Sequence, residues 1–232
     1  MSYKTFTVGF QNVQRGIPNA DVILEEGFRR EWDVVFLAEP WVNRRPSGWA
    51  TTMHDEYNMV STLGQDTRLV AYVNKRYRGQ EVEKKEESPD WCVLKVRGQT
   101  TAGVYMRKKW TVQECGVVVD NLGSYWRRGG RALLLGDWNA HHQLWGRNLA
   151  INDGKGKVIK EQLESKGGKW LGIVGEGTWR RPRLGRVQES IIDLAWQGPE
   201  DDWQITERFW TTSDHKAISF RNSIEPVGSV NS

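Results

Sequence analysis

Cysteine and long hydrophobic runs are both scarce in this chain of 232 residues, and each shortage excludes a class of protein. Two cysteines, Cys92 and Cys115, are too few for a disulfide framework or a four-thiolate metal site, and their apolar neighbours predict buried thiols. Apolar runs such as Val34 to Ala38 are far too short to cross a bilayer, and the N-terminus lacks the apolar stretch of a signal peptide. We therefore expect a soluble protein that is not exported and has no membrane partner.

An excess of one charge is nearly absent as well, because 33 Lys and Arg face 29 Asp and Glu, which gives a formal net charge of +4. The basic residues are nevertheless clustered. The clusters are Arg107-Lys108-Lys109, then Arg127, Arg128 and Arg131, then Arg180, Arg181, Arg183 and Arg186. Such clusters favour an anionic polymer as partner, with an ordinary solvated surface as the alternative.

Alternating or continuous apolar segments predict many strands and a few helices. The expected strands are Thr5–Asn12, Asp33–Glu39, Tyr57–Ser61, Arg68–Asn74, Trp91–Arg97, Thr101–Met106, Arg131–Asp137, Lys169–Val174, Ser190–Trp196, Trp203–Phe209 and Ala217–Arg221. The expected helices are Pro18–Arg30, with Val22, Leu24 and Phe28 on its apolar face, Thr111–Arg127 and Lys155–Ser165. The charged segment Glu81–Asp90 reads as an exposed loop. This pattern predicts one α/β domain over residues 1–224, with a flexible polar tail over residues 225–232.

Acidic and amide side chains stand at the ends of several expected strands. Asn12 closes the first, Glu39 closes VVFLAE, and Asp137 and Asn139 close ALLLGDWN. Asp214 precedes the last strand. Because Mg²⁺ takes oxygen ligands and commonly binds one or two carboxylates, a cluster of Glu39, Asp137 and Asp214 predicts a site for a hard divalent cation.

Asp193 is unusual because it interrupts an apolar strand, between Ile192 and Leu194. A buried aspartate needs a partner, since an unpaired charge away from water is costly. His215, next to Asp214, is a candidate proton shuttle.

Taken together and in this order, the motifs resemble the endonuclease–exonuclease–phosphatase superfamily. The resemblance covers the chain from Asn12 to His215 and is carried by LAEPW, GDWNAHHQLWG (Gly136–Gly146), SIIDLAW and SDHKAISF. Within the superfamily, the block NAHHxxWG after GDxN and the block IDL are most similar to the endonuclease domains of non-LTR retrotransposons.

The resemblance implies a four-layer αββα sandwich, in which two mixed β-sheets pack face to face with helices outside, and a Mg²⁺-dependent DNA endonuclease, with Mn²⁺ as a possible substitute. It implies that Glu39 is the main metal ligand, with Asn12 and Asp214 near the ion. Asp137 would orient or deprotonate the attacking water, and Asn139 would hold the scissile phosphate. His215 would act on the phosphate or as general acid and base, held by Asp193.

Tyr105, in AGVYM, stands at the place of the family tyrosine that contacts the phosphate. The match departs there, because many members continue Tyr-x-Pro-Asn whereas this chain has Tyr-Met-Arg-Lys. The pair His141 and His142 lacks a third ligand nearby, so we expect a structural role beneath the site, with Trp145 packed close to it.

The segment Thr178–Arg186 (TWRRPRLGR) is rich in arginine and reads as a hairpin or loop just before SIIDLAW. Its candidate DNA contacts are Trp179, Arg180, Arg181 and Arg183, because arginines bind phosphates and enter minor grooves. Arg44 and Arg45 form a weaker candidate on the side of Glu39. A solvated basic loop is the alternative.

The family also implies products with a 5′-phosphate and a free 3′-hydroxyl, which primes reverse transcription at the target. It further implies fusion to a reverse transcriptase and a nuclear location. We expect an isolated domain to be monomeric and to act on double-stranded DNA. An abasic-site repair endonuclease, a phosphatase of the same superfamily and a catalytically inactive DNA-binding module remain as alternatives.

Overall fold

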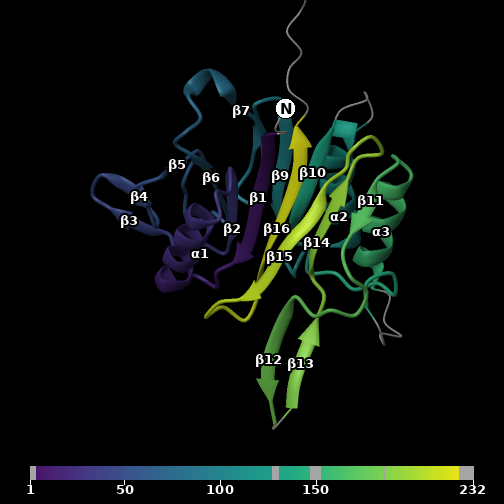
Figure 1. Cartoon of the computed structure of the whole chain (residues 1–232). Helices are drawn as coiled ribbons and strands as arrows, with labels where there is room; N and C mark the ends of the chain where they lie inside the picture. Colours follow the sequence, from purple (N-terminus) through teal and green to yellow (C-terminus); the bar gives the residue numbers. More distant parts are fainter. Residues whose placement is uncertain (1–3, 127–130, 147–152, 185, 225–232) are drawn as a thin grey trace, which may run out of the picture.

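The computed structural model describes residues 4–126, 131–146, 153–184 and 186–224. Two six-stranded sheets form its centre (Figure 1). In spatial order, the first contains β15 (Gln204–Trp210), β16 (Lys216–Ile224), β1 (Lys4–Asn12), β2 (Val34–Ala38), β6 (Leu69–Asn74) and β5 (Tyr57–Met59). The second contains β11 (Lys169–Leu171), β14 (Asp193–Gln197), β10 (Ala132–Asp137), β9 (Gln99–Tyr105), β8 (Trp91–Val96) and β7 (Val82–Glu87). The expected tail over residues 225–232 and the pair Arg127-Arg128 lie outside the described residues.

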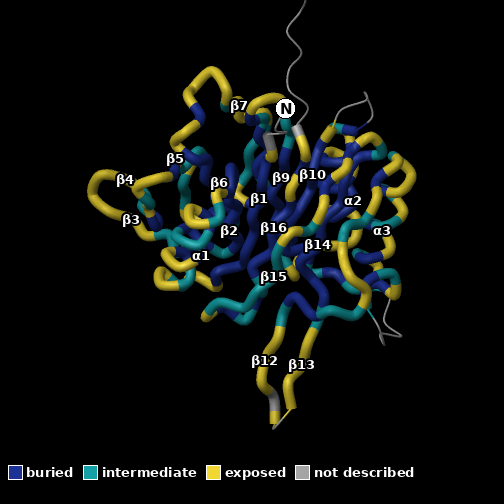
Figure 2. Tube along the Cα trace, viewed as in Figure 1, coloured by how far each residue is buried: buried dark blue, intermediate teal, exposed yellow. Residues whose placement is uncertain are grey.

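The core between the two sheets follows from the two-residue period of the strands. In β2, Val34, Phe36 and Ala38 face the second sheet, whereas Val35 and Leu37 face the opposite way. Strand β10 behaves likewise, because its residues at 133 and 135 join the core between the sheets and the residue at 134 joins the core under the helices. Both sheets are therefore buried on two faces, as Figure 2 shows by the dark blue strands at the centre.

Helices cover the outer faces. Helix α1 (Ile17–Arg29) packs on the first sheet, and α2 (Val112–Gly123) and α3 (Gly154–Glu164) pack on the second. The described residues also include two short 3₁₀ helices, η1 (Gly79–Glu81) and η2 (Ser124–Trp126). Helix α2 begins at a capping box, in which the Thr111 side chain accepts from the Glu114 amide and the Glu114 carboxylate accepts from the Thr111 amide. The predicted four-layer αββα sandwich is confirmed.

The buried face of α1 differs from the prediction. Val22 and Phe28 are exposed, and the helix instead buries Ala20, Ile23, Leu24 and Gly27, which recur at helical spacing. None of the helices in the described part of the chain is long and apolar enough to cross a membrane.

The prediction of a loop over Glu81–Asp90 was wrong, because β7 pairs there with β8 at the edge of the second sheet. An edge strand needs backbone pairing on one side only, so its side chains can be charged, and lysines at an edge also discourage pairing with other chains. The predicted strand Ser190–Trp196 is divided in two. Ser190 ends β13 (Arg186–Ser190) and Asp193 begins β14.

Two exposed hairpins extend from the sandwich (Figure 1). One joins β12 (Trp179–Arg183) to β13 and projects from the lower end of the sheets in this view. The other joins β3 (Asn43–Arg45) to β4 (Gly48–Ala50) and lies at the left, beyond α1. The segment predicted as a hairpin or loop over Thr178–Arg186 is thus the first strand and the turn of the β12–β13 hairpin.

Candidate active site

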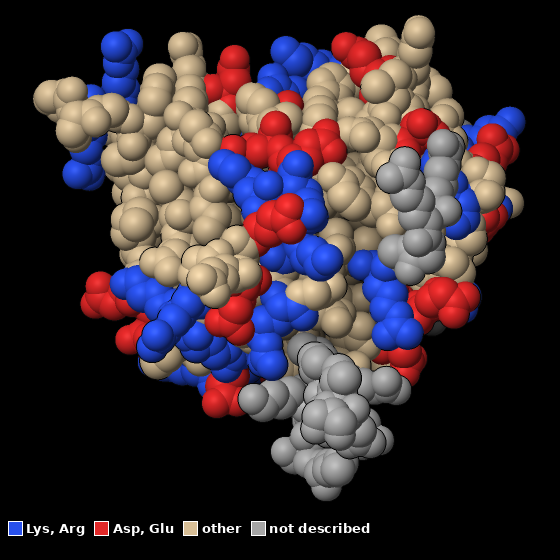
Figure 3. Space-filling view, turned by 90° about the horizontal axis from the view of Figure 1, so that it is seen from above, with Lys and Arg blue, Asp and Glu red and all other residues tan. Residues whose placement is uncertain are grey.

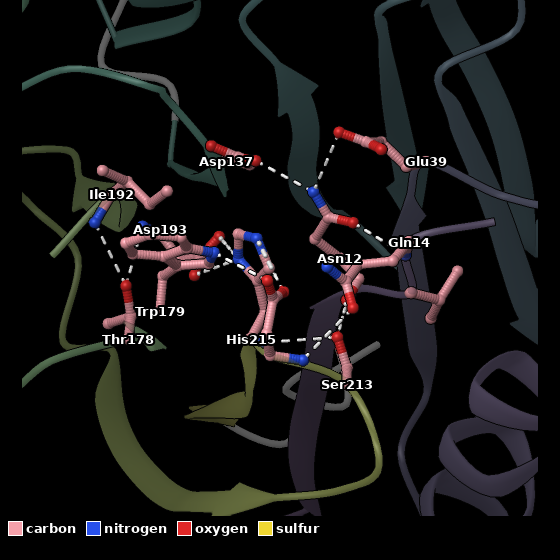
Figure 4. A network of polar contacts seen from close by, with 12 residues as sticks. Asn12, Gln14, Glu39, Asp137, Thr178, Trp179, Ile192, Asp193, Ser213 and His215 are labelled. Atoms are coloured by element: carbon pink, nitrogen blue, oxygen red, sulfur yellow. Dashed lines mark hydrogen bonds and ion pairs between the residues drawn. The ribbon is translucent and has the colours of Figure 1, made fainter. Parts of the chain in front are cut away.

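The strands that carry the predicted site residues end at the same edge of the sandwich. Strand β1 runs parallel to β2, and β9 runs parallel to β10, so the residues that follow all four strands meet below the two sheets. The antiparallel strand β14 begins with Asp193 opposite Asp137, and β16 begins beside the end of β1. Side chains from distant parts of the sequence are thereby brought together (Figure 4).

Asn12, Glu39, Tyr105 and Asp137 form one hydrogen-bonded cluster. The Asn12 amide nitrogen donates to Asp137 Oδ2 at 3.0 Å and faces Glu39 Oε1 at 3.4 Å. The Tyr105 hydroxyl donates to the same Glu39 oxygen at 2.7 Å. The side-chain oxygen of Asn12, Oδ1, instead accepts from the Gln14 backbone amide at 2.9 Å. Asn12 therefore presents its N–H groups to the carboxylates, and in this arrangement it positions them.

Two residues of the site have a left-handed backbone, Glu39 with φ 46° and Asn139 with φ 43°. Asparagine tolerates this region, but for glutamate it is unfavourable, and such strain is concentrated at functional sites. Both turns are held by hydrogen bonds. The Glu39 amide donates to the Arg68 carbonyl, and the Asn139 amide donates to Asp137 Oδ1 at 3.0 Å. Asn139 Nδ2 donates to the Met106 carbonyl at 2.9 Å, which orients its side chain.

Asp193 and His215 form the second part of the site. His215 Nδ1 lies 2.8 Å and 3.1 Å from the two carboxylate oxygens of Asp193, and both side chains are buried. The histidine backbone is fixed too, because its amide donates to Ser213 Oγ and its carbonyl accepts from Gln11. With Nδ1 bound, only Nε2 is left to act on a substrate.

Asp214 lies beside the free nitrogen of that imidazole. Its Oδ1 is 3.6 Å from His215 Nε2, and its Oδ2 accepts from Trp179 Nε1 at 2.9 Å. The Oδ1 atom is buried and has no hydrogen-bond partner in the described structure. Asp214 therefore adjoins the Asp193–His215 pair.

The carboxylates repel one another in this buried setting. Burial and the nearby charge of Asp193 raise the pKa of Asp137 to about 7, against the opposing effects of His215 and Asn12. Burial alone would lower the pKa of His215, but the charge and hydrogen bonds of Asp193 outweigh it and raise that pKa to about 9. Burial and the Glu39 hydrogen bond raise the pKa of Tyr105 well above its usual range. At neutral pH the imidazole is therefore a cation and the tyrosine a neutral donor.

The donor chemistry of the site fits a hard divalent cation. Glu39, Asp137 and Asp214 supply carboxylate oxygens, and one of these, Asp214 Oδ1, is a buried acceptor without a partner. Within the described part of the chain, the candidate ligand atoms of Asp137, Asp193 and His215 lie within 4.8 Å of one another. Glu39, Asp137 and Asp214 offer the oxygen atoms that Mg²⁺ prefers, although these three carboxylates do not form a group within that distance of one another.

The predicted DNA-contacting residues are divided between the two hairpins. Trp179 lies at the inner end of β12, half-buried, whereas Arg181 is exposed further along the same strand. The guanidinium of Arg180 stacks over the Trp210 ring at 4.0 Å. The side chain of Arg183 lies outside the described part. Arg44 and Arg45 are exposed on β3.

Three residues that support the site escaped the sequence reasoning. Ser213 Oγ donates to the backbone carbonyl of Asn12 at 2.7 Å and accepts from the backbone amide of His215, so it links the two parts of the site. Its place in SDH was a usable signal. Thr178 Oγ1 accepts from the amides of Ile192 and Asp193 at 3.1 and 3.0 Å, which turns the chain into β14. The Gln14 side-chain oxygen accepts from the Asp214 backbone amide at 3.3 Å, and no motif in the sequence indicates this contact.

The adjacent histidines have separate surroundings. The His142 ring is buried at 5.2 Å from the Trp145 ring, and its Nδ1 accepts from the Leu144 amide. His141 Nδ1 lies 3.2 Å from Ser190 Oγ. The packing of His142 against Trp145 is the structural arrangement that the sequence predicts.

A hollow of about 530 Å³ opens on the opposite end of the sandwich, which Figure 3 shows from above. It contains Arg30, Arg76, Arg97 and Arg221 together with Glu31 and Glu81. Three of the arginines are paired, Arg30 with two glutamates, Arg76 with the buried Asp33, and Arg97 with Glu81. Positive and negative side chains are therefore interspersed on this face.

A sandwich of two sheets with an Asp–His pair and clustered carboxylates at one edge defines a phosphoester hydrolase of the nuclease type. The sequence profile named endonuclease–reverse transcriptase matches residues 101–219, just over half of the chain. The chain therefore belongs to the endonuclease–reverse transcriptase family and is an enzyme of the nuclease class. No curated protein sequence matches it significantly.

Solved structures share the fold. The endonuclease domain of TRAS1, a telomere-specific non-LTR retrotransposon, superposes with a TM-score of 0.74 and 18% identity, over 95% of this chain and 100% of that one. The 3′-5′ exonuclease NExo of Neisseria meningitidis gives 0.68 and 15%, over 94% and 100%. An AP endonuclease of Archaeoglobus fulgidus gives 0.60 and 14%, over 93% and 98%. At these identities the likeness establishes the fold.

Proposed function

We propose that this chain is a divalent-metal-dependent DNA endonuclease that nicks double-stranded DNA and leaves a 3′-hydroxyl. The observation that carries the proposal is the buried Asp193–His215 pair beside the cluster of Glu39, Asp137 and Asn12. A pure binding module has no use for a charged histidine buried against several carboxylates, because burying these groups costs free energy.

The residues of the chain divide the chemistry among themselves. Asp137, whose raised pKa makes it a competent base near neutral pH, accepts a proton from the attacking water. His215, protonated at Nε2, stabilises the negative charge that develops on the phosphoryl oxygens, while Asp193 fixes its ring. Tyr105 donates to Glu39 and Asn139 donates to the Met106 carbonyl, so both polar side chains are held at this edge of the sandwich. The bond from phosphorus to O3′ breaks, and O3′ leaves as an alkoxide that takes a proton from solvent water and becomes the 3′-hydroxyl.

The residues that would hold the metal are Glu39 and Asp214, with Asp137 close by. When bound, a divalent ion supplies Lewis-acid stabilisation of the phosphoryl and leaving oxygens. Asn12, which donates to both Glu39 and Asp137, keeps those carboxylates together. The proposal includes Mg²⁺ as the natural ion and Mn²⁺ as a substitute.

The β12–β13 hairpin is the proposed DNA contact. It projects from the edge of the sandwich that carries the catalytic groups, and its exposed Arg181 and Arg186 suit phosphate binding (Figure 1). In the full-length protein we propose fusion to a reverse transcriptase that extends the new 3′-hydroxyl. Such a role places the protein in the nucleus, where the target DNA lies.

Abasic-site cleavage is the second candidate. A hollow of about 230 Å³ adjoins the site, bordered by Asn139, Trp179 and Ile192, and a space of this kind suits a residue turned out of the duplex. Two substrates separate the candidates, a supercoiled plasmid and an oligonucleotide duplex with one abasic site, each with Mg²⁺ and with EDTA. Nicking of the intact plasmid in Mg²⁺ alone supports the endonuclease. Cleavage of the abasic duplex alone moves the chain to repair, and no cleavage of either contradicts both.

A further inference from the structure

The base of the β12–β13 hairpin is bonded to the catalytic centre by both backbone and side chains. The Arg180 amide donates to the Asp214 carbonyl at 2.9 Å, and the Lys216 amide donates to the Thr178 carbonyl at 2.7 Å. These two bonds make an antiparallel bridge between Trp179 and His215. The hairpin strand is therefore directly paired with the segment that carries Asp214 and His215.

Trp179 adds a side-chain bond to a carboxylate of the site. Its Nε1 donates to Asp214 Oδ2 at 2.9 Å, and a hydrogen bond to a charged acceptor is among the stronger ones in proteins. A carboxylate on a loop has a freely rotating terminal torsion. The indole N–H holds that torsion so that the other oxygen, Oδ1, stays buried at 3.6 Å from His215 Nε2, within ion-pair distance but without a hydrogen-bond partner in the described structure.

The strand that carries the indole is held in place, because Arg180, the next residue, stacks on Trp210. Trp179 also borders the hollow beside Asn139 and His141. Because the N–H is bound to Asp214, only the ring faces remain for contact with DNA. The sequence predicts a DNA contact for Trp179, whereas in the folded chain its N–H group is bound to the Asp214 carboxylate.

We propose that Trp179 is a positioning residue, which fixes the Asp214 carboxylate for metal binding and catalysis and couples the DNA-contacting hairpin to the active site. This inference rests on the proposed function. Outer-sphere partners of ligating carboxylates typically contribute roughly 10- to 100-fold in metal affinity or activity. A contact of Trp179 with DNA alone would instead change DNA affinity.

The test is Trp179→Phe, which keeps an aromatic ring and removes the N–H donor. The matched control is Trp126→Phe, which removes an indole bond of 2.8 Å to the Ala132 carbonyl, remote from the site. Three quantities are measured: Mn²⁺ affinity of the protein alone by calorimetry, kcat and KM for plasmid nicking, and DNA affinity in EDTA. We expect weaker Mn²⁺ binding and a kcat reduced roughly 10- to 100-fold for Trp179→Phe, with KM and DNA affinity unchanged. The control should match the wild-type protein in all three.

Unchanged Mn²⁺ affinity and kcat would overturn the inference, and so would a loss confined to DNA affinity. If Trp179→Phe does not fold, the indole N–H resonances of the wild-type protein are compared with those of Asp214→Ala. One resonance should move upfield when its carboxylate acceptor is removed, and no movement would overturn the inference. Both the calorimetry and the resonances are independent of nicking. A wild-type protein that binds Mn²⁺ but does not nick would therefore contradict the proposed function. The Mn²⁺ affinity of Trp179→Phe would still decide this inference.

Discussion

The two exposed hairpins look alike in composition but differ in how they are attached. Both are two-stranded, and both carry arginines. At the base of the β12–β13 hairpin, Thr178, Trp179 and Arg180 are bonded to two residues of the catalytic centre, Asp193 and Asp214. The base of the β3–β4 hairpin is closed by one bond of 2.5 Å, from Thr51 Oγ1 to the Trp41 carbonyl. Within the described part of the chain, no hydrogen bond or ion pair joins β3 or β4 to a residue of the site.

The difference shows that basic charge alone does not identify a functional surface. Arg44-Arg45 and Arg180-Arg181 are equivalent as sequence, yet only the second pair stands on a strand paired with His215. The β12–β13 hairpin is thus joined to the site by hydrogen bonds between distant parts of the sequence, whereas the β3–β4 hairpin follows Glu39 along the chain.

The largest effect is expected where the inner end of the β12–β13 hairpin meets the catalytic pair. Asp193→Asn keeps the shape of the side chain but removes the charge that orients and stabilises the His215 imidazolium. We expect kcat to fall about 10³- to 10⁴-fold, as in other hydrolases that lose this carboxylate, with DNA affinity in EDTA unchanged. The pKa of His215, measured by NMR titration, should fall from its value of about 9 because the charge of Asp193 raises it. A variant that keeps wild-type kcat would remove the pair from the mechanism.

The threonines at the two hairpin bases give a matched comparison. Thr178→Val leaves the buried amides of Ile192 and Asp193 without an acceptor, which should lower the free energy of unfolding by about 1–3 kcal/mol and reduce kcat as β14 shifts. Thr51→Val breaks one bond at the other base and should leave kcat unchanged. Chemical denaturation and nicking rates measure both effects. Equal losses of kcat in the two variants would erase the distinction between the hairpins.

Salt dependence of DNA binding compares the arginines directly. Replacing Arg181 and Arg186 with alanine should weaken affinity and reduce the slope of log K against log salt by up to about 1.8, since each phosphate contact contributes about 0.9. Replacing Arg44 and Arg45 should change the slope less. An unchanged slope in the first variant would exclude the β12–β13 hairpin from the interface.

The smallest effect is expected at the hairpin turn. Leu184 is 96% exposed, so Leu184→Ala should change the free energy of unfolding by no more than about 0.5 kcal/mol. Thermal unfolding measures it. A larger loss would mean that the turn packs against the body of the protein, contrary to the free projection of this hairpin.

Much of the fold was predictable because buried strands have a strong signature. ALLLGD and VVFLA are mainly apolar runs, the first ending in Asp137 and the second followed by Glu39. Each lies in a strand that has a parallel neighbour, so these acidic residues mark the edge at which the strands end. Strand β7 was missed because the charged side chains of an edge strand carry no such signature. The short strands of the β3–β4 hairpin have fully exposed or half-buried side chains and were missed for the same reason.

The site was predictable in its members and less so in its contacts. The motifs named Glu39, Asp137, Asp193 and His215, but no pattern shows that Asn12 directs its N–H groups, and not its carbonyl oxygen, toward the carboxylates. The bond from Trp179 to Asp214 joins residues 35 positions apart through a strand pairing that only the folded chain reveals. The local sequence therefore identifies the residue types of the site, whereas the orientation of their side chains depends on tertiary structure.

The central claim is that this edge of the sandwich hydrolyses a DNA phosphodiester and leaves a 3′-hydroxyl. The most direct test nicks a supercoiled plasmid with the wild-type protein and with His215→Ala in Mg²⁺, then offers the products to a DNA polymerase with labelled nucleotides. We predict label incorporation at nicks made by the wild-type protein and neither nicks nor label with His215→Ala. Nicks that the polymerase extends only after phosphatase treatment, or equal nicking by both proteins, would contradict the account.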